Sequence, residues 1–421
     1  MNYAEAVEQI TSRGRFGVKL GLDRTRAILE RAGNPQLGLR GALVAGTNGK
    51  GSTAAMLAAI LHEAGHTVGT MPSPHLSSYT ERIQVDGTPI TEAEFAAAVD
   101  WLLPKLEGMD EELGPPTEFE LLTTIALTYL ARHCDRLVVE VGMGGRLDST
   151  NVLDLGVAVV TNVDLDHQQY LGDTIEKIAY EKAGVIKTGN AVVTGASQRA
   201  LVAVDARAAE VGATVWRLHG EIHHARRTLG WEGVEVDVKG PGFSCSARTP
   251  LLGRFQGDNA ALAMAAAYAI DEVGCEAMRA GLAGVVWPGR LEHVGDHPAV
   301  LLDGGHNPAA IRWLAQTIPE LAGGRRLVVV FGMMADKDLR SALAELRQLR
   351  AAEVVFTAAE SPRAAAPEHL AELWGGGEVI SSPELAVWRA IELAGLEGMV
   401  LVCGSLYLVG AVRPMLVAAR R

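Results

Sequence analysis

The sequence predicts an α/β fold in which a larger domain, built on a mainly parallel sheet with a small antiparallel β portion, precedes a smaller Rossmann-like α/β domain. Short apolar runs of strand length alternate with amphipathic helical stretches along the chain. The apolar runs are rich in valine and show little polar alternation, as strands buried on both faces of a parallel sheet require. At 421 residues the chain is long enough for two domains, each with its own core.

The first domain is expected to extend over residues 1–290. Its buried strands are predicted at 41–45, 136–141 and 157–162. Apolar residues recur at helical spacing in the intervening stretches, which predicts helices at 50–64, 118–133, 174–186 and 258–270. The segment 231–239 alternates valine with charged residues, so an antiparallel strand outside the main sheet is expected there.

The second domain is expected at residues 298–421, after a linker at 291–297. Prolines and glycines gather around this linker, and a regular alternation of strands and helices follows it. The strands are predicted at 299–303, 326–331, 353–356, 378–380 and 399–403. Residues 399–419 are mostly apolar and about long enough to span a bilayer, but Gly404, Gly410, Arg413 and Pro414 interrupt them. A buried strand, a turn and a helix are therefore expected there.

Composition excludes several classes of protein. The net charge of −12 provides no basic field for general nucleic-acid binding. The four cysteines are scattered and show no paired spacing, so neither a zinc site nor a disulfide framework is expected: Cys134, Cys245, Cys275 and Cys403. The first residues lack the basic and apolar regions of a signal peptide. A cytoplasmic protein is therefore predicted.

A glycine-rich turn follows the first predicted strand and leads into a helix. It consists of Gly46, Thr47, Asn48, Gly49, Lys50, Gly51, Ser52 and Thr53. Glycines let backbone N–H groups approach phosphate oxygens, the helix N-terminus adds partial positive charge, and the lysine supplies a mobile cation. The hydroxyl groups of Ser52 and Thr53 are candidates to face the phosphates or their magnesium. These features predict a P-loop that binds ATP, and they disfavour a plain strand-to-helix turn.

Two more strand ends carry groups that could bind a metal. Glu140 ends the strand at 136–141, and open α/β sheets place their ligands at this edge. His167 follows Asp164 and Asp166 after the next strand. A hydrogen-bonded edge carboxylate and a structural histidine are the alternatives. Because Mg²⁺ prefers oxygen ligands, the residue types alone support a histidine ligand only weakly.

Lys182 belongs to the inward-facing stripe of the helix at 174–186, together with Ile175, Ile178 and Ala179. A lysine on such a stripe must find a partner, extend its amine to solvent, or lose its charge. Desolvation lowers the pKa of the amine and leaves it nucleophilic, so that it can react with CO₂ to form a carbamate. Spacing alone leaves open a lysine that reaches water at the rim of the helix.

The second domain has polar residues at its own first strand-to-helix turn. Asp303 and His306 lie there, and Pro308 is well placed to open the helix. A capping turn, with Asn307 as the helix N-cap and His306 incidental, is the alternative. Arg290 could reach a phosphate from the linker region, although an exposed linker arginine is usually only solvated.

Together these segments resemble the folylpolyglutamate synthases and bifunctional dihydrofolate synthases of the Mur ligase superfamily. The compressed spacing of the P-loop, with two residues between Gly46 and Gly49, is the form seen there. Similar blocks run along nearly the whole chain: 20–23, 46–52, 73–76, 81–83, 117–120, 140–148, 166–167, 181–184, 255–259, 303–308, 331–333 and 336–338. Two local departures are Gly305 and Ser149, at positions where alanine is frequent in the family.

The resemblance implies roles for individual residues. It implies ATP and Mg²⁺ as cofactors, with K⁺ as a further ion and a CO₂-derived carbamate on Lys182. The magnesium ligands would be Ser73, Glu140 and His167. Besides the P-loop, the residues that contact ATP would be Asn259, Arg290, Asp303 and His306. The residues on the folate side would be His75, Arg82, Thr117, Phe119 and Glu120. The catalytic group would comprise Lys50, Lys182, Asp303 and His306.

The implied reaction joins a pteroate or folate to L-glutamate. The carboxylate attacks the γ-phosphate of ATP to give an acyl phosphate, and the glutamate amine then displaces phosphate. The second domain would close over the site and exclude water. Both dihydrofolate synthase and folylpolyglutamate synthase activities are expected, in a monomer.

Two alternatives are weighed against this reading. A cell-wall Mur ligase acting on a UDP-MurNAc-peptide would need a UDP-binding domain, and only about forty residues precede the P-loop. A catalytically silent, nucleotide-gated binding protein would have no use for Lys50, Glu140, His167 and Lys182 together.

Overall fold

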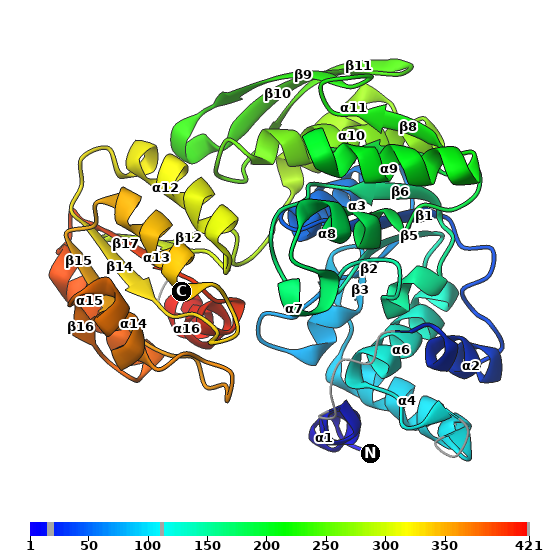
Figure 1. Cartoon of the computed structure of the whole chain (residues 1–421), viewed down its shortest axis with the longest axis horizontal. Helices are drawn as coiled ribbons and strands as arrows, with labels where there is room; N and C mark the ends of the chain where they lie inside the picture. Colours follow the sequence, from blue (N-terminus) through cyan, green and yellow to red (C-terminus); the bar gives the residue numbers. More distant parts are fainter. Residues whose placement is uncertain (15–20, 110–112, 419–421) are drawn as a thin grey trace. The chain divides into compact units, whose positions relative to one another are not determined.

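The computed structural model describes residues 1–14, 21–109 and 113–418, which form two compact units (Figure 1). The first unit comprises Met1–Ala225, Val236–Arg248 and Gly257–Val285, and the second comprises Arg226–Glu235, Thr249–Gln256 and Val286–Arg421. Leu20, the first residue of one family-like block, lies outside the described residues. Residues 292–296, expected in a linker, form a strand of the second unit.

An eight-stranded sheet forms the centre of the first unit, in the order β4-β3-β2-β5-β1-β6-β7-β8. The larger part is parallel, whereas β3 and β4 pair antiparallel at one edge. The strands are β1 (Gly41–Ala45), β2 (Val68–Met71), β3 (Gln84–Val85), β4 (Thr88–Pro89), β5 (Arg136–Glu140), β6 (Gly156–Val160), β7 (Ala191–Thr194) and β8 (Thr214–Arg217). Every residue of β1 is buried, which explains its continuous apolar run.

Helices surround this sheet (Figure 1). They are α1 (Tyr3–Gly14), α2 (Asp23–Arg31), α3 (Lys50–Glu63), η1 (Tyr79–Arg82), α4 (Glu92–Leu102), η2 (Leu103–Leu106), α6 (Glu118–His133), η3 (Ser149–Val152), α7 (Gln168–Leu171), α8 (Ile175–Ala183), α9 (Gln198–Val211), α10 (Gln256–Asp271) and α11 (Cys275–Gly284). The helix predicted at 118–133 is confirmed with the same bounds. Both ends of α6 are encoded locally, because Thr117 caps its first turn and His133 lies in its last.

A separate three-stranded sheet has the order β11-β10-β9. Its strands are β9 (His223–Thr228), β10 (Val234–Gly240) and β11 (Phe243–Thr249), with a short helix η4 (Gly230–Glu232) before β10. Only two residues join β10 to β11, and such a connection links antiparallel neighbours. The predicted antiparallel strand outside the main sheet is therefore confirmed as β10.

The expectation of unpaired cysteines was wrong for one pair. Cys245 of β11 and Cys275 at the start of α11 form a disulfide, with their Cα atoms 5.4 Å apart. The two residues are 30 positions apart in the sequence, and only the packing of α11 beside this sheet brings them together. Cys134 and Cys403 remain free thiols.

The second unit is built on a six-stranded sheet in the order β12-β13-β17-β14-β15-β16. The strands are β12 (Glu292–Asp296), β13 (Ala299–Leu302), β14 (Leu327–Phe331), β15 (Glu353–Phe356), β16 (Glu378–Val379) and β17 (Met399–Cys403). The edge strand β12 is antiparallel to β13, and the others are parallel. All five strands predicted for this domain are confirmed, each to within one residue at either end.

The crossover helices of this unit are α12 (Pro308–Ala322), α13 (Leu339–Leu346) with η5 (Arg347–Leu349), α14 (Pro367–Trp374), α15 (Pro383–Ala394) and α16 (Leu406–Ala418). From β13 through β14 and β15 to β16 the chain moves across the sheet in one direction, and it then returns to place β17 between β13 and β14. Right-handed crossovers therefore place α15 on the face opposite to α12, α13 and α14. The apolar segment forms β17 and α16 over residues 399–403 and 406–418, as expected, and within the described residues no helix is long and apolar enough to cross a membrane.

Candidate active site

The glycine-rich turn leaves the sheet between two strand ends. β1 pairs with β5 on one side and β6 on the other, with Val44 opposite Glu140 and Ala45 opposite Val160. Because parallel strands end at the same edge, this register places Glu140 and the residue after Val160 beside the turn. The structure thus confirms that the predicted P-loop lies at the ligand edge of the sheet.

Two glycines of the turn are required by close packing. Gly46 has φ 151° and Gly49 has φ 81°, a region that side chains disfavour. A Cβ atom on Gly49 would lie 2.4 Å from Asn259 Oδ1, and one on Gly46 would lie 1.9 Å from Thr161 Oγ1. Asn259 of α10 and Thr161 therefore pack directly on the P-loop.

The segment that follows β6 holds the loop through hydrogen bonds. Thr161 Oγ1 and Asn162 Nδ2 donate to Asn48 O at 2.7 and 2.9 Å, and Asn48 N donates to Asn162 Oδ1 at 2.9 Å. Thr47 Oγ1 donates to Asp164 O at 3.1 Å and accepts from Asp164 N at 2.9 Å. Sequence reasoning assigned no role to Thr161 and Asn162, although they directly follow a strand whose end was already singled out.

Charged groups meet at the start of α3. Lys50 Nζ lies 4.0 Å from Glu140 Oε1 and donates to Thr47 O at 3.3 Å. Glu140 Oε2 accepts a hydrogen bond from Ser73 N at 3.2 Å. Ser52 is 3% exposed and Thr53 is fully buried, so both hydroxyl groups are shielded by the surrounding protein. The structure therefore brings the loop lysine, Glu140 and Ser73 together.

The residue types partly fit a magnesium ion. Glu140 and Ser73 offer a carboxylate and a hydroxyl, which are the oxygen donors that Mg²⁺ prefers. His167 precedes α7 with φ 52°, and its Nε2 is 3.9 Å from Asp166 Oδ2. No cluster of three or more His, Cys, Asp or Glu side chains that could hold a metal occurs in the part of the chain that the structure describes. A Mg²⁺ ion here would thus draw further ligands from water or nucleotide, as this ion commonly does.

Lys182 is buried beside the P-loop, which confirms that it lies on the inward face of its helix. The residue is 4% exposed, and its Nζ donates to Gly46 O at 2.8 Å. Burial, and secondarily the charge of Lys50, lowers the pKa of Lys182 to about 7, although Asp166 and Asp148 oppose this shift. The amine is therefore largely neutral at slightly alkaline pH.

A second cluster connects Ser73 with two residues predicted on the folate side. Buried Arg82 donates through Nε to His75 Nδ1 at 3.0 Å and through one terminal nitrogen to Ser73 Oγ at 2.9 Å. Burial and the Arg82 charge lower the pKa of His75 to about 4, so the imidazole is neutral at physiological pH. The His75 ring lies 4.3 Å from that of Tyr79. This aromatic surface is joined through Ser73 to Glu140.

The remaining folate-side residues form the start of α6. Thr117 and Glu120 make a capping box, in which Thr117 N donates to Glu120 Oε2 at 2.7 Å. The same carboxylate, only 2% exposed, accepts from Arg24 Nε at 3.0 Å to each oxygen. Phe119 packs against Gly142, where a Cβ atom would lie 2.7 Å from its ring. Glu120 thus fixes the helix end, and Phe119 faces the turn that follows Glu140.

In the second unit, Arg290, Asp303 and His306 lie around the turn after β13. Asp303 is 5% exposed and accepts from Leu291 N at 2.9 Å and Gly305 N at 2.7 Å. Burial raises the pKa of Asp303, and the Arg290 charge opposes that shift. His306 Nδ1 is 3.0 Å from Gly304 O. Asp303 therefore organises the backbone that carries the other two side chains.

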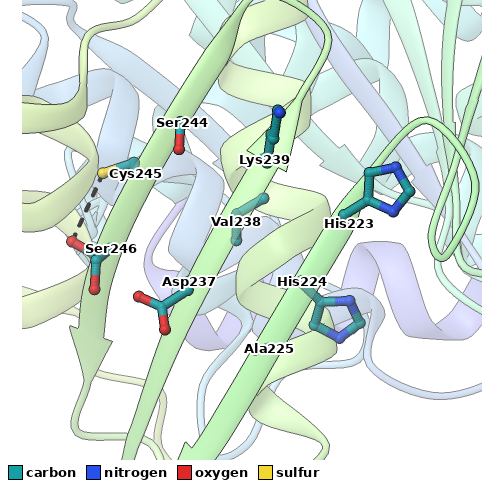
Figure 2. Close-up of a pocket in the computed structure, with 9 residues that line it drawn as sticks. All are labelled: His223, His224, Ala225, Asp237, Val238, Lys239, Ser244, Cys245 and Ser246. Carbon is teal, nitrogen blue, oxygen red and sulfur yellow. Dashed lines mark hydrogen bonds between the residues drawn. The ribbon is translucent and has the colours of Figure 1, made fainter.

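A hollow of about 440 Å³ lies elsewhere in the first unit, on the three-stranded sheet (Figure 2). Its polar lining residues include His223, Asp237, Lys239, Ser244 and Ser246. The predicted site residues do not line it, so this hollow is separate from the candidate active site.

Comparison with known proteins supports one family. The model of the Mur ligase middle domain matches residues 44–267, and that of the Mur ligase glutamate ligase domain matches residues 289–406. Dihydrofolate synthase/folylpolyglutamate synthase of Bacillus subtilis is 37% identical, over 98% of this chain and 99% of that protein.

Two solved structures show the same fold. Mycobacterium tuberculosis folylpolyglutamate synthase complexed with ADP and AMPPCP has a TM-score of 0.92 and 33% identity, covering 99% of both chains. FolC of E. coli in complex with DHPP and ADP has a TM-score of 0.91 and 33% identity, covering 100% of this chain and 99% of that one. The chain therefore belongs to the Mur ligase family, among the dihydrofolate synthases and folylpolyglutamate synthases.

Proposed function

We propose that this protein is an ATP-dependent ligase that joins L-glutamate to the carboxylate of a pteroate or folate. The observation that carries the proposal is the P-loop whose Lys50 lies 4.0 Å from Glu140 and whose Gly46 carbonyl is bound by the buried Lys182. These groups combine a phosphate cradle, a carboxylate suited to a metal and a reactive amine. The activities for which the B. subtilis and M. tuberculosis relatives are named support the same conclusion.

The reaction proceeds in two steps. A carboxylate oxygen of the substrate attacks the γ-phosphorus of ATP, the bond to the bridging oxygen breaks, and ADP leaves. The amine of glutamate then attacks the acyl carbon, loses a proton and expels phosphate. Lys50 stabilises the negative charge that develops on the transferred phosphoryl group, because its side chain is a mobile cation at the start of α3.

Nucleotide contacts come from both units in this proposal. In the first unit they are residues 46–53 and the side chain of Asn259, which already packs against Gly49. In the second unit they are Arg290, Asp303 and His306. Arg290 supplies positive charge. Asp303 accepts hydrogen bonds from the amide of Leu291, which follows the arginine, and from the amide of Gly305, which precedes His306.

Ser73, Glu140 and His167 would hold Mg²⁺, which when bound neutralises charge on the phosphates. The protein groups prepare this position, because Ser73 N orients Glu140 and Arg82 orients the Ser73 hydroxyl. Lys182 would carry a carbamate formed from CO₂, since its lowered pKa leaves a neutral amine. We include K⁺ in the proposal as a further bound ion and assign no residue to it.

The folate-side residues of the proposal are His75, Arg82, Thr117, Phe119 and Glu120. The neutral His75 ring and the Phe119 ring offer flat apolar surfaces to a pterin, and Arg82 fixes the first of them. Thr117 and Glu120 act by fixing the start of α6. We further propose that both synthase activities are present, in a monomer that works in the cytoplasm where its ATP is supplied.

The test is a turnover assay with purified protein. ADP release should require a pteroate or folate and L-glutamate together, and mass spectrometry should show a product heavier by one glutamyl residue. Dihydropteroate and tetrahydrofolate tested side by side would separate the two synthase activities. ADP release that is indifferent to glutamate would contradict the proposed function.

A further inference from the structure

Arg290 is flanked by two backbone amides, each held by a carboxylate. On one side Gly289 N donates to Glu292 Oε2 at 2.9 Å, and on the other Leu291 N donates to Asp303 Oδ2 at 2.9 Å. Leu291 has φ 44°, a conformation that a side chain with a branched apolar group rarely adopts. Such a conformation persists only where the surroundings hold it in place. The segment 289–291 is therefore fixed by its neighbours and not by its own preference.

Glu292 is itself held by an arginine from a distant part of the chain. Arg413 of α16 donates through Nε to both carboxylate oxygens, at 3.0 and 2.8 Å, and through Nη2 to Oε1 at 2.8 Å. The Glu292 side chain is 18% exposed and that of Arg413 is 27% exposed. Charge-assisted bonds in this forked geometry are strong and directional. Arg413 thus fixes the carboxylate that in turn fixes Gly289.

A comparable pair at the other edge of the same sheet provides a reference. Arg389 of α15 donates through Nε to both oxygens of Glu378, at 3.0 and 3.1 Å. Glu378 begins β16, whereas Glu292 begins β12, and these strands are the two edges of the sheet. The pairs are alike in chemistry, but only Glu292 also bonds an amide next to Arg290.

We propose that Glu292 is a positioning residue for Arg290, and that Arg413 positions Glu292. The inference rests on the proposed function in one respect, namely that Arg290 binds a phosphate of ATP. Without the Glu292 carboxylate, the backbone at 289–291 can leave its strained conformation and the guanidinium of Arg290 samples many directions. Productive nucleotide binding then becomes rarer, while contacts with the other two substrates stay as they are.

The experiment compares steady-state constants of Glu292→Ala, Glu292→Gln and Arg413→Met with those of Glu378→Ala as the matched control. Glu292→Ala should raise KM for ATP about 10-fold or more, because misplacement of a phosphate contact weakens both ground and transition states. Glu292→Gln keeps an acceptor for Gly289 N and should raise KM by roughly 3-fold. KM for glutamate and for the pteroate should stay within about 2-fold of the wild type, as should all constants of Glu378→Ala.

A charge reversal separates positioning from simple stabilisation. The double variant Glu292→Arg/Arg413→Glu restores the ion pair but offers no acceptor to Gly289 N. Its Tm should return toward the wild-type value while KM for ATP remains raised. Full recovery of KM in this variant, or an unchanged KM in folded Glu292→Ala, would overturn the proposal.

Failure of the proposed function remains distinguishable from failure of this inference. If the wild type shows no glutamate-dependent turnover, the affinities of the same variants for MgADP are compared by calorimetry in place of KM. Weaker binding in Glu292→Ala than in Glu378→Ala supports the inference, and equal binding in both overturns it.

Discussion

The turn after β1 and the turn after β13 share one order of elements, a buried strand, glycines and a helix, but their helices begin differently. The helix after the first of these turns, α3, follows Gly49, which has φ 81° and no side chain that could cap the helix. The helix after the second turn, α12, begins at Pro308. It follows Asn307, whose side chain accepts a hydrogen bond from Ala310 N at 2.9 Å. No side chain caps the start of α3, whereas at the start of α12 Asn307 accepts one amide and Pro308 has no N–H to offer.

This difference shows that a position at the ligand edge of the sheet does not determine whether a turn binds its ligand through backbone amides or through side chains. Where the helix start is uncapped, phosphate can be bound by the backbone and by the partial charge of the helix. Where a side chain and a proline occupy the helix start, only side chains such as Arg290 and His306 are left to act. Similar sequence patterns in the two units therefore predict different chemistry once the caps are considered.

The largest expected effect concerns Lys182, whose amine bonds the first turn. Lys182→Ala should lower kcat by about 10²–10³-fold, as loss of one preorganised charged group at a phosphoryl-transfer site does. Added acetate or formate should restore part of the activity by taking the place of a carbamate. Lys177→Ala, on an exposed position of the same helix, is the control.

The pKa of Lys182, lowered to about 7 by burial, gives this prediction a pH dependence. Below pH 7 the amine is protonated and cannot attack CO₂, and above pH 7 it is neutral. Activation by added bicarbonate should therefore grow as pH rises from about 6 to 8, with the carbamate followed by ¹³C NMR. Wild-type activity in Lys182→Ala would refute the carbamate.

The two turns should also respond differently when a glycine is replaced. In Gly49→Ala the new Cβ would meet Asn259 Oδ1 at 2.4 Å at a positive φ, so we expect kcat/KM for ATP to fall roughly 100-fold. In Gly305→Ala the Cβ would lie 2.8 Å from Asp303 Oδ1, and a small movement of that side chain should limit the loss to less than about 10-fold. Equal losses in the two variants would contradict the comparison.

Local patterns in the sequence were sufficient for much of the fold and part of the site. Helical periodicity placed Lys182 on the inward face of its helix but left open whether its amine reaches water, and strand ends located Glu140 and Asp303 at the ligand edges. The fold class, the antiparallel strand β10 and five of the six strands of the second unit were predicted because each depends on residues close in sequence, whereas β12 lies where a linker was expected.

Contacts between distant residues were not predictable in this way. The Cys245–Cys275 disulfide, the Arg24–Glu120 ion pair and the Glu292–Arg413 pair join residues separated by 30, 96 and 121 positions. Each depends on how helices pack against sheets, which a single sequence does not specify. The bonds from Thr161 and Asn162 to Asn48 are also long-range, although the adjacency of β1 and β6 makes them understandable afterwards.

The smallest expected effect concerns the cap of the second turn. Replacing Asn307 with alanine removes the acceptor for Ala310 N and should lower the free energy of unfolding by about 1 kcal/mol, measured by urea denaturation. Asn307→Asp retains an acceptor and should stay near the wild type. Because α12 is expected to have no nucleotide contact through its amides, KM for ATP should change by less than about 2-fold in both variants. An increase in KM as large as that of Gly49→Ala would mean that the start of α12 binds nucleotide after all, and the two turns would then work alike.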